Sequence, residues 1–567
     1  MNTTSAGRLR DALTAAALFL ASAAFTLWQN ARVAALWDLS YLLDSSYRFR
    51  LGQMPYRDFP FVHPPLHYLL HAAIIRIFGR VYYPHVLCAT FEAGLATVVT
   101  WRILLTLLKP FASRTWLLAT LLAAPLTVVG IYAIYPHPIY DSDAILAILF
   151  ALYLLQRADA SPDHAPLSPA RNLIAGAACV LPLFVKQNIG LPFLLILLAA
   201  VAAIAVSRRL QHVAIAPQLW ILTGAFVTLA AAILAIHLTG GLRNYLYWTI
   251  TFAGQRRLPS FGVILDTYHQ TSLLWTIPAA LAAIALLYIP TLGTRRWARF
   301  AALALLAFPF LWTVAGLAIT NDPDDRADQL LSLWPHLLIL AAGLAIWNLR
   351  RLRATPTLHT LLPIILLATI EGTFLSQQLW GSTYAIWPLL MLLIAAMLVE
   401  APTIARPLAA IVAATFLLCG GLYATSHERL SYIQLDGPET QATLPALRGL
   451  TTPGPWIPNF EELVRFTNAE IPANDGILLL PGEDPFYFAT GRAPQFPILL
   501  FDPATDPYTP QQTLDQARAH NIRWLIVNRN LQIETVAEPD LPEVLRLLQQ
   551  DFAPYRNLTN YDIYRRK

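Results

Sequence analysis

The chain has 567 residues, of which 56% are hydrophobic and only 13% are charged, and its net charge is +5. Soluble domains usually contain about one quarter charged residues, so this composition excludes an ordinary soluble protein. We also expect no nucleic-acid partner. The three cysteines, Cys88, Cys179 and Cys419, all lie inside apolar runs. They are therefore interpreted as small buried side chains, not as a disulfide framework or a metal site.

In chain order, about 13 apolar segments approach the ~20 residues that a helix needs to cross a ~30 Å hydrocarbon core. Backbone in lipid must satisfy its own hydrogen bonds, so we expect each segment to be a helix. The sequence thus predicts an α-helical polytopic membrane protein. The predicted spans are 11–34, 83–108, 114–134, 143–157, 172–187, 189–206, 214–238, 272–290, 299–319, 331–348, 358–376, 384–399 and 405–423.

The first span begins like a signal peptide, because Arg8 and Arg10 precede an apolar stretch that ends in Ala21, Ser22 and Ala23. We favour an uncleaved helix, since the apolar character continues to position 36. Near the other end of the membrane module, three aromatic residues are expected to lie in an interfacial belt. They are Trp380, Tyr384 and Trp387.

Lysine and arginine are concentrated in one set of loops, which predicts a cytoplasmic N-terminus in an inner or plasma membrane. The opposite loops contain acidic clusters and three longer segments, namely 35–82, 239–271 and the C-terminal tail. These segments are therefore expected to lie outside. The basic loops contain Arg8, Arg10, Lys109, Arg114, Arg157, Arg171, Arg208, Arg209, Arg295, Arg296, Arg299, Arg350, Arg351, Arg353 and Arg406.

Residues 424–567 differ in composition from the membrane module 1–423, because apolar runs shorten and Pro, Asp, Glu and Arg become more frequent. The runs Ile477–Leu480 and Trp524–Val527 predict short buried strands. Residues 460–470, 511–520 and 541–550 predict amphipathic helices. Strands that alternate with helices are typical of an α/β domain, and with about 13 spans this domain is expected to be extracytoplasmic.

The external segment 35–82 has an unusual density of charged and aromatic residues. It contains Trp37-Asp38, the run Pro55-Tyr56-Arg57-Asp58-Phe59, and His63-Pro64-Pro65-Leu66. Residues 66–79 are apolar but too short to span comfortably, so they predict a helix in the membrane interface. A plain connecting loop has no need for such a composition, and we infer that this loop carries chemistry.

This pattern resembles the GT-C-fold glycosyltransferases, which include the protein O-mannosyltransferases and the lipid A aminoarabinose transferases. The resemblance covers about three quarters of the chain and is concentrated at 37–80, 141–155 and 181–192. It implies an inverting transfer of a sugar from a polyprenyl-phosphate carrier to a lipid, glycan or protein acceptor on the outer face. Val62-His63 stands where some relatives have Glu-Lys, which leaves the donor sugar and any need for a divalent cation open.

The resemblance places the catalytic base at Asp38, the loop aspartate after the first span. A carboxylate at the membrane surface can accept the proton of an attacking hydroxyl group; alternatively, Asp38 caps a helix. Asp44 is a weaker candidate for substrate binding, because Arg48 four residues later would make an ordinary helical ion pair with it.

The phosphate leaving group needs fixed cations, since its charge grows as the bond breaks. Lys186, followed by Gln187, lies between two apolar spans, where a lysine is costly unless it is paired or functional. The resemblance implies that it contacts the carrier phosphate; alternatively, it extends to the lipid headgroups. Arg243, Arg256 and Arg257 in the second external segment are further candidates.

Further substrate-binding candidates are acidic or aromatic residues of the external loops. Asp141 and Asp143 open the fourth span and could orient the acceptor, the sugar or a metal, or only cap the helix. His63 could bind sugar or phosphate, or only precede the two prolines. Tyr56, Arg57 and Asp58 complete the candidate set, and no residue is assigned as a metal ligand.

Two other functions are compatible with a polytopic chain. A lipid or solute transporter or flippase would carry ionisable residues in mid-span and paired repeats with broken helices, whereas here the charges lie mostly at span ends. A scaffold whose outer domain binds a partner would leave the charged segment 35–65 unexplained. The sequence identifies neither the sugar nor the acceptor.

Overall fold

The computed structural model describes residues 5–133, 135–158, 169–351, 357–376, 385–533 and 540–567. The sequence-based predictions for Arg353, Trp380 and Tyr384 lie outside these ranges. Trp387 packs in the interior against Trp334 and is fully buried, so its assignment to an interfacial aromatic belt is wrong.

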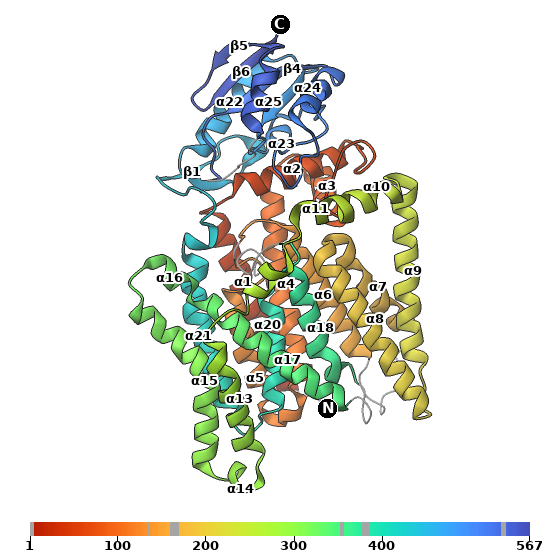
Figure 1. Ribbon diagram of the computed structural model, residues 1–567, viewed down its shortest axis with the longest axis vertical. Helices are drawn as coiled ribbons and strands as arrows, with labels where there is room; N and C mark the ends of the chain where they lie inside the picture. The colour runs from red at the N-terminus through yellow and green to blue at the C-terminus, as the bar shows by residue number, and fades with distance from the viewer. Residues whose placement is uncertain (1–4, 134, 159–168, 352–356, 377–384, 534–539) are drawn as a thin grey trace.

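A bundle of helices makes up the larger part of the molecule (Figure 1). Every predicted span contains at least one helix, and seven helical stretches of the described chain are long and apolar enough to cross a membrane. The bundle helices are α1 (Ser5–Asn30), α4 (Tyr83–Leu107), α5 (Thr115–Ala123), α6 (Tyr140–Ala158), α7 (Pro169–Val185), α8 (Gln187–Leu210), α9 (Ala216–Thr239), α13 (Leu273–Tyr288), α15 (Arg296–Ile319), α17 (Leu333–Arg351), α18 (Leu358–Thr373), α20 (Trp387–Val399) and α21 (Ala405–Thr425).

The predicted span 114–134 is not one continuous helix. The α-helix α5 ends at Ala123 and a 3-10 turn follows over Ala124–Thr127. Pro125 has no N–H group to continue the helical hydrogen-bond pattern, which explains why the helix ends there.

Small residues allow the closest helix contact in the bundle, between α7 and α9. A Cβ atom on Gly176 would overlap the backbone of Ile221, and a Cβ atom on Gly224 would overlap that of Leu173. In a membrane, where lipid is as apolar as leucine, such close backbone approach is a main source of helix association. Side chains of α7 and α9 also line the larger of the two cavities described in the next subsection.

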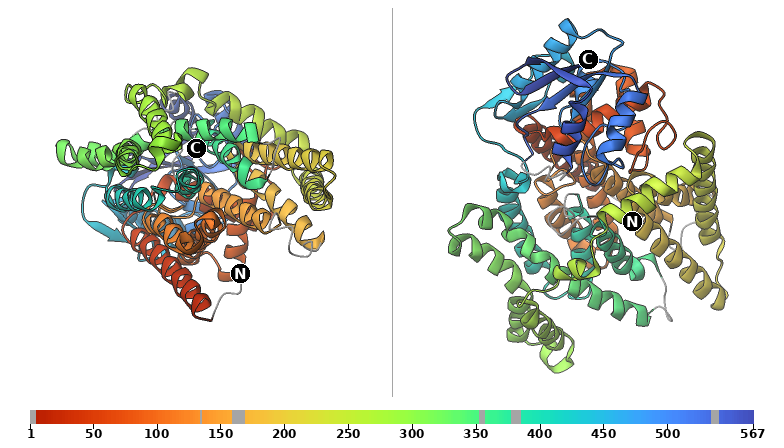
Figure 2. Two further views of the ribbon diagram at one scale, coloured as in Figure 1. Left: turned by 90° about the horizontal axis from the view of Figure 1, so that it is seen from below. Right: turned by 45° about the horizontal axis from the view of Figure 1, so that its top comes forward.

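The predicted external segments gather at one end of the bundle (Figures 1 and 2). The short helix α14 (Pro290–Gly293) lies toward the other end. The elements of the gathered end are α2 (Leu36–Arg50), α3 (Leu66–Phe78), α10 (Leu242–Leu246), the π-helix η3 (Tyr247–Phe252), α11 (Ala253–Arg257) and α12 (Phe261–Asp266).

A small α/β domain covers this end. Its four-stranded sheet has the order β3-β4-β6-β5, in which β3 and β4 are parallel and the other pairs are antiparallel. The predicted strands lie within β3 and β4, whereas β5 and β6 were not predicted. The elements are β1 (Glu439–Gln441), β2 (Thr451–Pro453), α22 (Trp456–Glu470), β3 (Gly476–Leu480), α23 (Phe486–Thr490), α24 (Pro510–Ala519), β4 (Ile522–Asn528), α25 (Leu541–Leu548), β5 (Phe552–Asn557) and β6 (Tyr561–Arg566).

The helix α2 is held against the α/β domain by hydrogen bonds to backbone groups. Asp44 is 2% exposed and accepts hydrogen bonds from the backbone N–H groups of Tyr487 (3.1 Å) and Phe488 (2.6 Å). The Ser40 hydroxyl group donates to the carbonyl oxygen of Gly482 at 2.8 Å. Asp44 is therefore a docking residue in the described structure, and its assignment to substrate binding stays a prediction.

Arg48 docks the next turn of α2 in the same way. Its guanidinium group is buried, donates to the carbonyl oxygens of Phe496 and Pro497, and lies 4.7 Å from the ring centroid of Phe59. The predicted ion pair between Asp44 and Arg48 is not among the ion pairs of the described residues. Both side chains are used to fix α2 relative to the C-terminal domain.

We expect Asp44→Ala to lower the free energy of unfolding by about 3 kcal/mol, because two buried N–H groups would lose their acceptor. The thermal unfolding midpoint of the purified protein measures the effect. Asp515→Ala, which removes an exposed carboxylate on α24, serves as the control and should change stability by less than about 0.5 kcal/mol. Equal midpoints for the two variants would contradict the docking role.

Candidate active site

A small cavity of about 50 Å³ lies where α2, the start of α6, α11 and the C-terminal domain meet. Polar and aromatic side chains line most of it. Three of the lining residues, Leu500, Asp502 and Thr505, come from the C-terminal domain, so the bundle alone does not enclose this space. The other lining residues are Trp37, Asp38, Tyr41, Leu42, His63, His67, Tyr68, Pro138, Ile139, Tyr140 and Arg257.

Asp38 is one of the two carboxylates that line this cavity, and the other is Asp502. The pKa of Asp38 is raised to about 6, chiefly by burial and to a smaller extent by the nearby charges of Asp141 and Asp502. The Tyr432 hydroxyl group, which donates to Oδ2 at 2.8 Å, and the positive charge of Arg257 lower it. The side chain is thus ionised at neutral pH yet basic enough to accept a proton.

A second and larger cavity, of about 500 Å³, adjoins the first. Most of its wall is apolar and comes from α7, α8, α9 and the α10–α11 segment, with Leu183, Leu191, Leu229 and Ile233 among the lining residues. His63 and Arg257 line both cavities. The two spaces therefore meet at a boundary that carries one imidazole and one guanidinium group.

Lys186 lies in the wall of the larger cavity, between α7 and α8. It is 7% exposed, forms an ion pair with Asp141, and its Nζ lies 4.7 Å from the ring centroid of Tyr140. Tyr140 itself lines the small cavity. Asp38 and Lys186 consequently stand at the same end of the bundle, on two cavities that share part of their walls, as the sequence-based hypothesis requires.

His63 lies between the two candidate charges. It is 5% exposed, and its ring stacks on Tyr140 with centroids 4.4 Å apart. Burial lowers the pKa of His63 well below its usual range, and the charges of Arg257 and Lys186 lower it further. A neutral imidazole at this position can donate or accept a hydrogen bond without adding charge.

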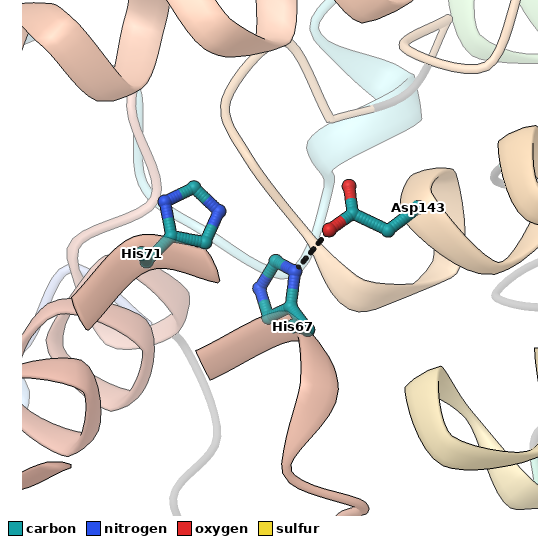
Figure 3. Close-up of side chains that lie close together, drawn as sticks. All are labelled: His67, His71 and Asp143. Carbon is teal, nitrogen blue, oxygen red and sulfur yellow. Dashed lines mark hydrogen bonds and ion pairs between the residues drawn. The ribbon is translucent and has the colours of Figure 1, made fainter. Parts of the chain in front are cut away.

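Asp143 does not face Asp38. It points to the other side of α6, where its carboxylate contacts His67 Nδ1 at 2.7 Å (Figure 3). Its partner Asp141, two residues earlier, faces Lys186. Asp141 and Asp143 were both candidates for substrate binding, and the structure gives them different partners.

Tyr56, Arg57 and Asp58 are among the predicted residues that lie outside the two cavities. Tyr56 is buried and donates a hydrogen bond to the carbonyl oxygen of His63 at 2.6 Å, which shapes the loop. Arg57 and Asp58 form an exposed ion pair with each other, with Nε and Oδ1 2.7 Å apart. Tyr56 thus holds the loop, Arg57 and Asp58 lie at the surface, and their assignment to substrate binding stays a prediction.

The candidates of the second external segment also differ from one another. Arg257 lines both cavities, whereas Arg243 is exposed and lines neither. Arg256 is exposed and donates to the carbonyl oxygen of Pro503 at 3.2 Å, so it contacts the C-terminal domain. Gln187 lines the larger cavity and donates to the carbonyl oxygens of Val62 and Thr249. Of the three arginines, only Arg257 keeps a place at the site.

Sequence reasoning missed the contributions of the tail and of the aromatic residues. Tyr432 and Asp502 lie more than 390 residues after Asp38 in the chain, and no local pattern connects them to it. Tyr140 immediately precedes the acidic pair, and its aromatic character beside charged residues was the available indication. His67 and His71 share one face of α3 at a four-residue spacing, which also indicates a site.

No family model matches the sequence, and no curated protein matches it. Among solved structures, the chain is similar over nearly its whole length to ArnT from Cupriavidus metallidurans. The form bound to undecaprenyl phosphate has 12% identity, a TM-score of 0.44, and coverage of 99% of this chain and 98% of that one. The apo form has 13% identity, a TM-score of 0.46 and 97% coverage of both chains. The Archaeoglobus fulgidus oligosaccharyltransferase tethered to an acceptor peptide has 11% identity, a TM-score of 0.48, and coverage of 98% and 74%.

The buried pair of Lys186 and Asp141 makes a stability prediction. Lys186→Met should lower the free energy of unfolding by about 3–5 kcal/mol, because it leaves Asp141 charged and unpaired in a buried place. Adding Asp141→Asn should recover most of this loss. Thermal unfolding of the two single variants and the double variant measures the coupling. The exposed pair of Arg546 and Glu543 is the control, since Arg546→Met should cost less than about 1 kcal/mol. Strictly additive losses at Lys186 and Asp141 would contradict the pairing.

Proposed function

We propose that this chain is an inverting GT-C-type glycosyltransferase that moves a sugar from a polyprenyl-phosphate carrier to an acceptor on the outer face of a cell membrane. One observation carries the proposal: a half-buried carboxylate with a raised pKa and a buried lysine line two cavities that share His63 and Arg257. The motif resemblance at 37–80 and the placement of that segment at one end of the bundle support it.

The reaction is a single displacement at the anomeric carbon. The acceptor hydroxyl oxygen attacks that carbon, its proton passes to Asp38, and the bond between the sugar and the phosphate breaks. Polyprenyl phosphate leaves with the bonding electrons. Attack opposite to the leaving group inverts the configuration, and one carboxylate is sufficient as base.

The leaving phosphate needs positive charge on the side away from Asp38. Lys186 and Arg257 both line the larger cavity and supply it. Asp141 is the one ion-pair partner of Lys186 among the described residues, and a lysine ammonium group has three N–H donors. Fixed cations in a water-poor site stabilise the developing phosphate charge without having to reorganise.

The carrier chain needs an apolar surface that continues from the phosphate site. The larger cavity provides one, because aliphatic side chains of α8 and α9 line the same cavity as Lys186 and Arg257. We therefore place the phosphate at these two cations and the first isoprene units against Leu191, Leu229 and Ile233. The acceptor then approaches from the side of the C-terminal domain.

Asp38→Asn should lower the transfer rate by about 100-fold or more, because an amide cannot accept the proton. The assay uses proteoliposomes and a panel of polyprenyl-phosphate sugars. Asp515→Asn makes the same chemical change on the exposed face of α24 and should keep the wild-type rate. Wild-type turnover by the Asp38 variant would rule out this carboxylate as the base.

The acid side of the pH–rate profile should report the pKa of Asp38. The base works when ionised, so activity should rise with pH through about 6 and then level off. Tyr432→Phe removes a hydrogen bond that favours the ionised form, and it should move the rise to higher pH by about one unit. Tyr555→Phe, on the outer sheet of the C-terminal domain, should leave the profile in place. A profile that Tyr432→Phe does not move would show that another group titrates.

A further inference from the structure

Three buried side chains meet beside the small cavity but are not used by the proposed transfer. His67 and His71 belong to α3, and Asp143 belongs to α6 (Figure 3). One ligand atom of each lies within 4.8 Å of the others. All three are less than 10% exposed, so the cluster is enclosed by protein and not open to bulk water.

The hydrogen bonds of His67 leave one ring nitrogen with an unused lone pair. A carboxylate is an acceptor, so the 2.7 Å contact with Asp143 requires the imidazole to donate through Nδ1. The Nε2 atom of a neutral His67 is then a bare acceptor. It is fully buried and has no hydrogen-bond partner within the described part of the chain. A buried acceptor in this state costs free energy.

The same reasoning applies to the neighbouring histidine pair. His71 and His85 face each other with their Nδ1 atoms 2.7 Å apart, so one of the two rings must donate and the other accept. The ring that donates through Nδ1 carries a bare lone pair on Nε2. Both Nε2 atoms are buried and lack a partner among the residues that the structure covers.

The electrostatic balance points to a cation. In the described chain His67 is the one ion-pair partner of Asp143. The other carboxylate oxygen of Asp143, Oδ1, is buried and has no hydrogen-bond partner among the described residues. A divalent ion bound by Asp143 and by His67 Nδ1, in place of the proton that joins them, would compensate the negative charge, and His71 would offer the lone pair of its Nε2.

The geometry points to a site for one divalent transition metal, and we propose that His67, His71 and Asp143 bind zinc or a chemically similar ion. Histidines four residues apart on one helix face can bind the same ion, and two imidazoles with one carboxylate form a familiar zinc donor set. His85 then orients His71 by accepting its Nδ1–H, as a supporting partner of a metal-bound histidine commonly does. The ion would join α3 to the start of α6.

This site differs from the proposed transfer site in its residues. It uses neither Asp38, Lys186 nor Arg257, and Asp141 points away from it toward Lys186. His67 also lines the small cavity, so the ion would fix one wall of that cavity. The metal proposal does not depend on the transferase proposal, because metal content can be measured without substrate.

The test is a metal analysis of the full-length protein, purified in detergent without a polyhistidine tag. The protein is stripped with a chelator, exposed to Zn²⁺, separated from free metal and analysed by mass spectrometry of the elements. We expect about one zinc per chain, visible absorption bands when Co²⁺ replaces Zn²⁺, and a higher thermal midpoint with zinc than without it.

The variant His71→Gln should bind at least tenfold less zinc and lose the zinc-dependent rise of the thermal midpoint. His336→Gln is the matched control: this buried histidine has both ring nitrogens within 3.2 Å of hydroxyl groups, those of Ser272 and Thr276, and it should retain one zinc. A wild-type protein that holds less than about 0.1 zinc per chain after loading would overturn the proposal. This outcome does not depend on whether a variant folds. Full zinc binding by His71→Gln would overturn the assigned ligands.

Discussion

A charge enclosed by protein at the end of a membrane bundle is costly unless another group compensates it, and this constraint organises the candidate site. Lys186 is tolerated because Asp141 pairs with it and Tyr140 lies under it. Asp38 is tolerated because Tyr432 and Arg257 favour its ionised form. Each compensation is incomplete, since burial still raises the pKa of Asp38 to about 6. An incompletely compensated carboxylate is a better proton acceptor than an exposed aspartate, whose pKa is near 4.

The C-terminal domain is part of this compensation and does more than cover the bundle. It holds α2 through the buried hydrogen bonds of Asp44 and Arg48, and α2 in turn carries Asp38. The segment that leads into the domain supplies Tyr432, and the domain supplies Asp502 and Thr505 to the small cavity. The position of Asp38 therefore depends on contacts between segments about 400 residues apart in the chain.

The sequence predicted the parts of the fold that depend on local patterns. Long apolar runs located the bundle helices, and two short apolar runs in the tail located β3 and β4. Position 38 and position 186 were proposed from a motif and from the cost of a lysine between two spans. The sequence could not predict which groups each charged side chain contacts in the folded chain. Asp44 and Arg48 are four residues apart and predict a local ion pair, yet each is bound by backbone groups of the C-terminal domain instead. Likewise, Arg243, Arg256 and Arg257 are equivalent by composition, and only folding shows that Arg257 lines the cavities.

Helix geometry explains why the acidic pair at the start of α6 is divided between two sites. Residues two positions apart on an α-helix are about 200° apart around its axis, so Asp141 and Asp143 cannot face the same ligand while both remain in the helix. Both belong to the first turn of α6. Asp141 therefore faces Lys186, and Asp143 faces the histidines of α3. The motif Asp141-Ser142-Asp143 would serve one cation only where the chain is not helical. In this fold, one carboxylate holds the lysine proposed to bind phosphate, and the other is left for the imidazole cluster behind it.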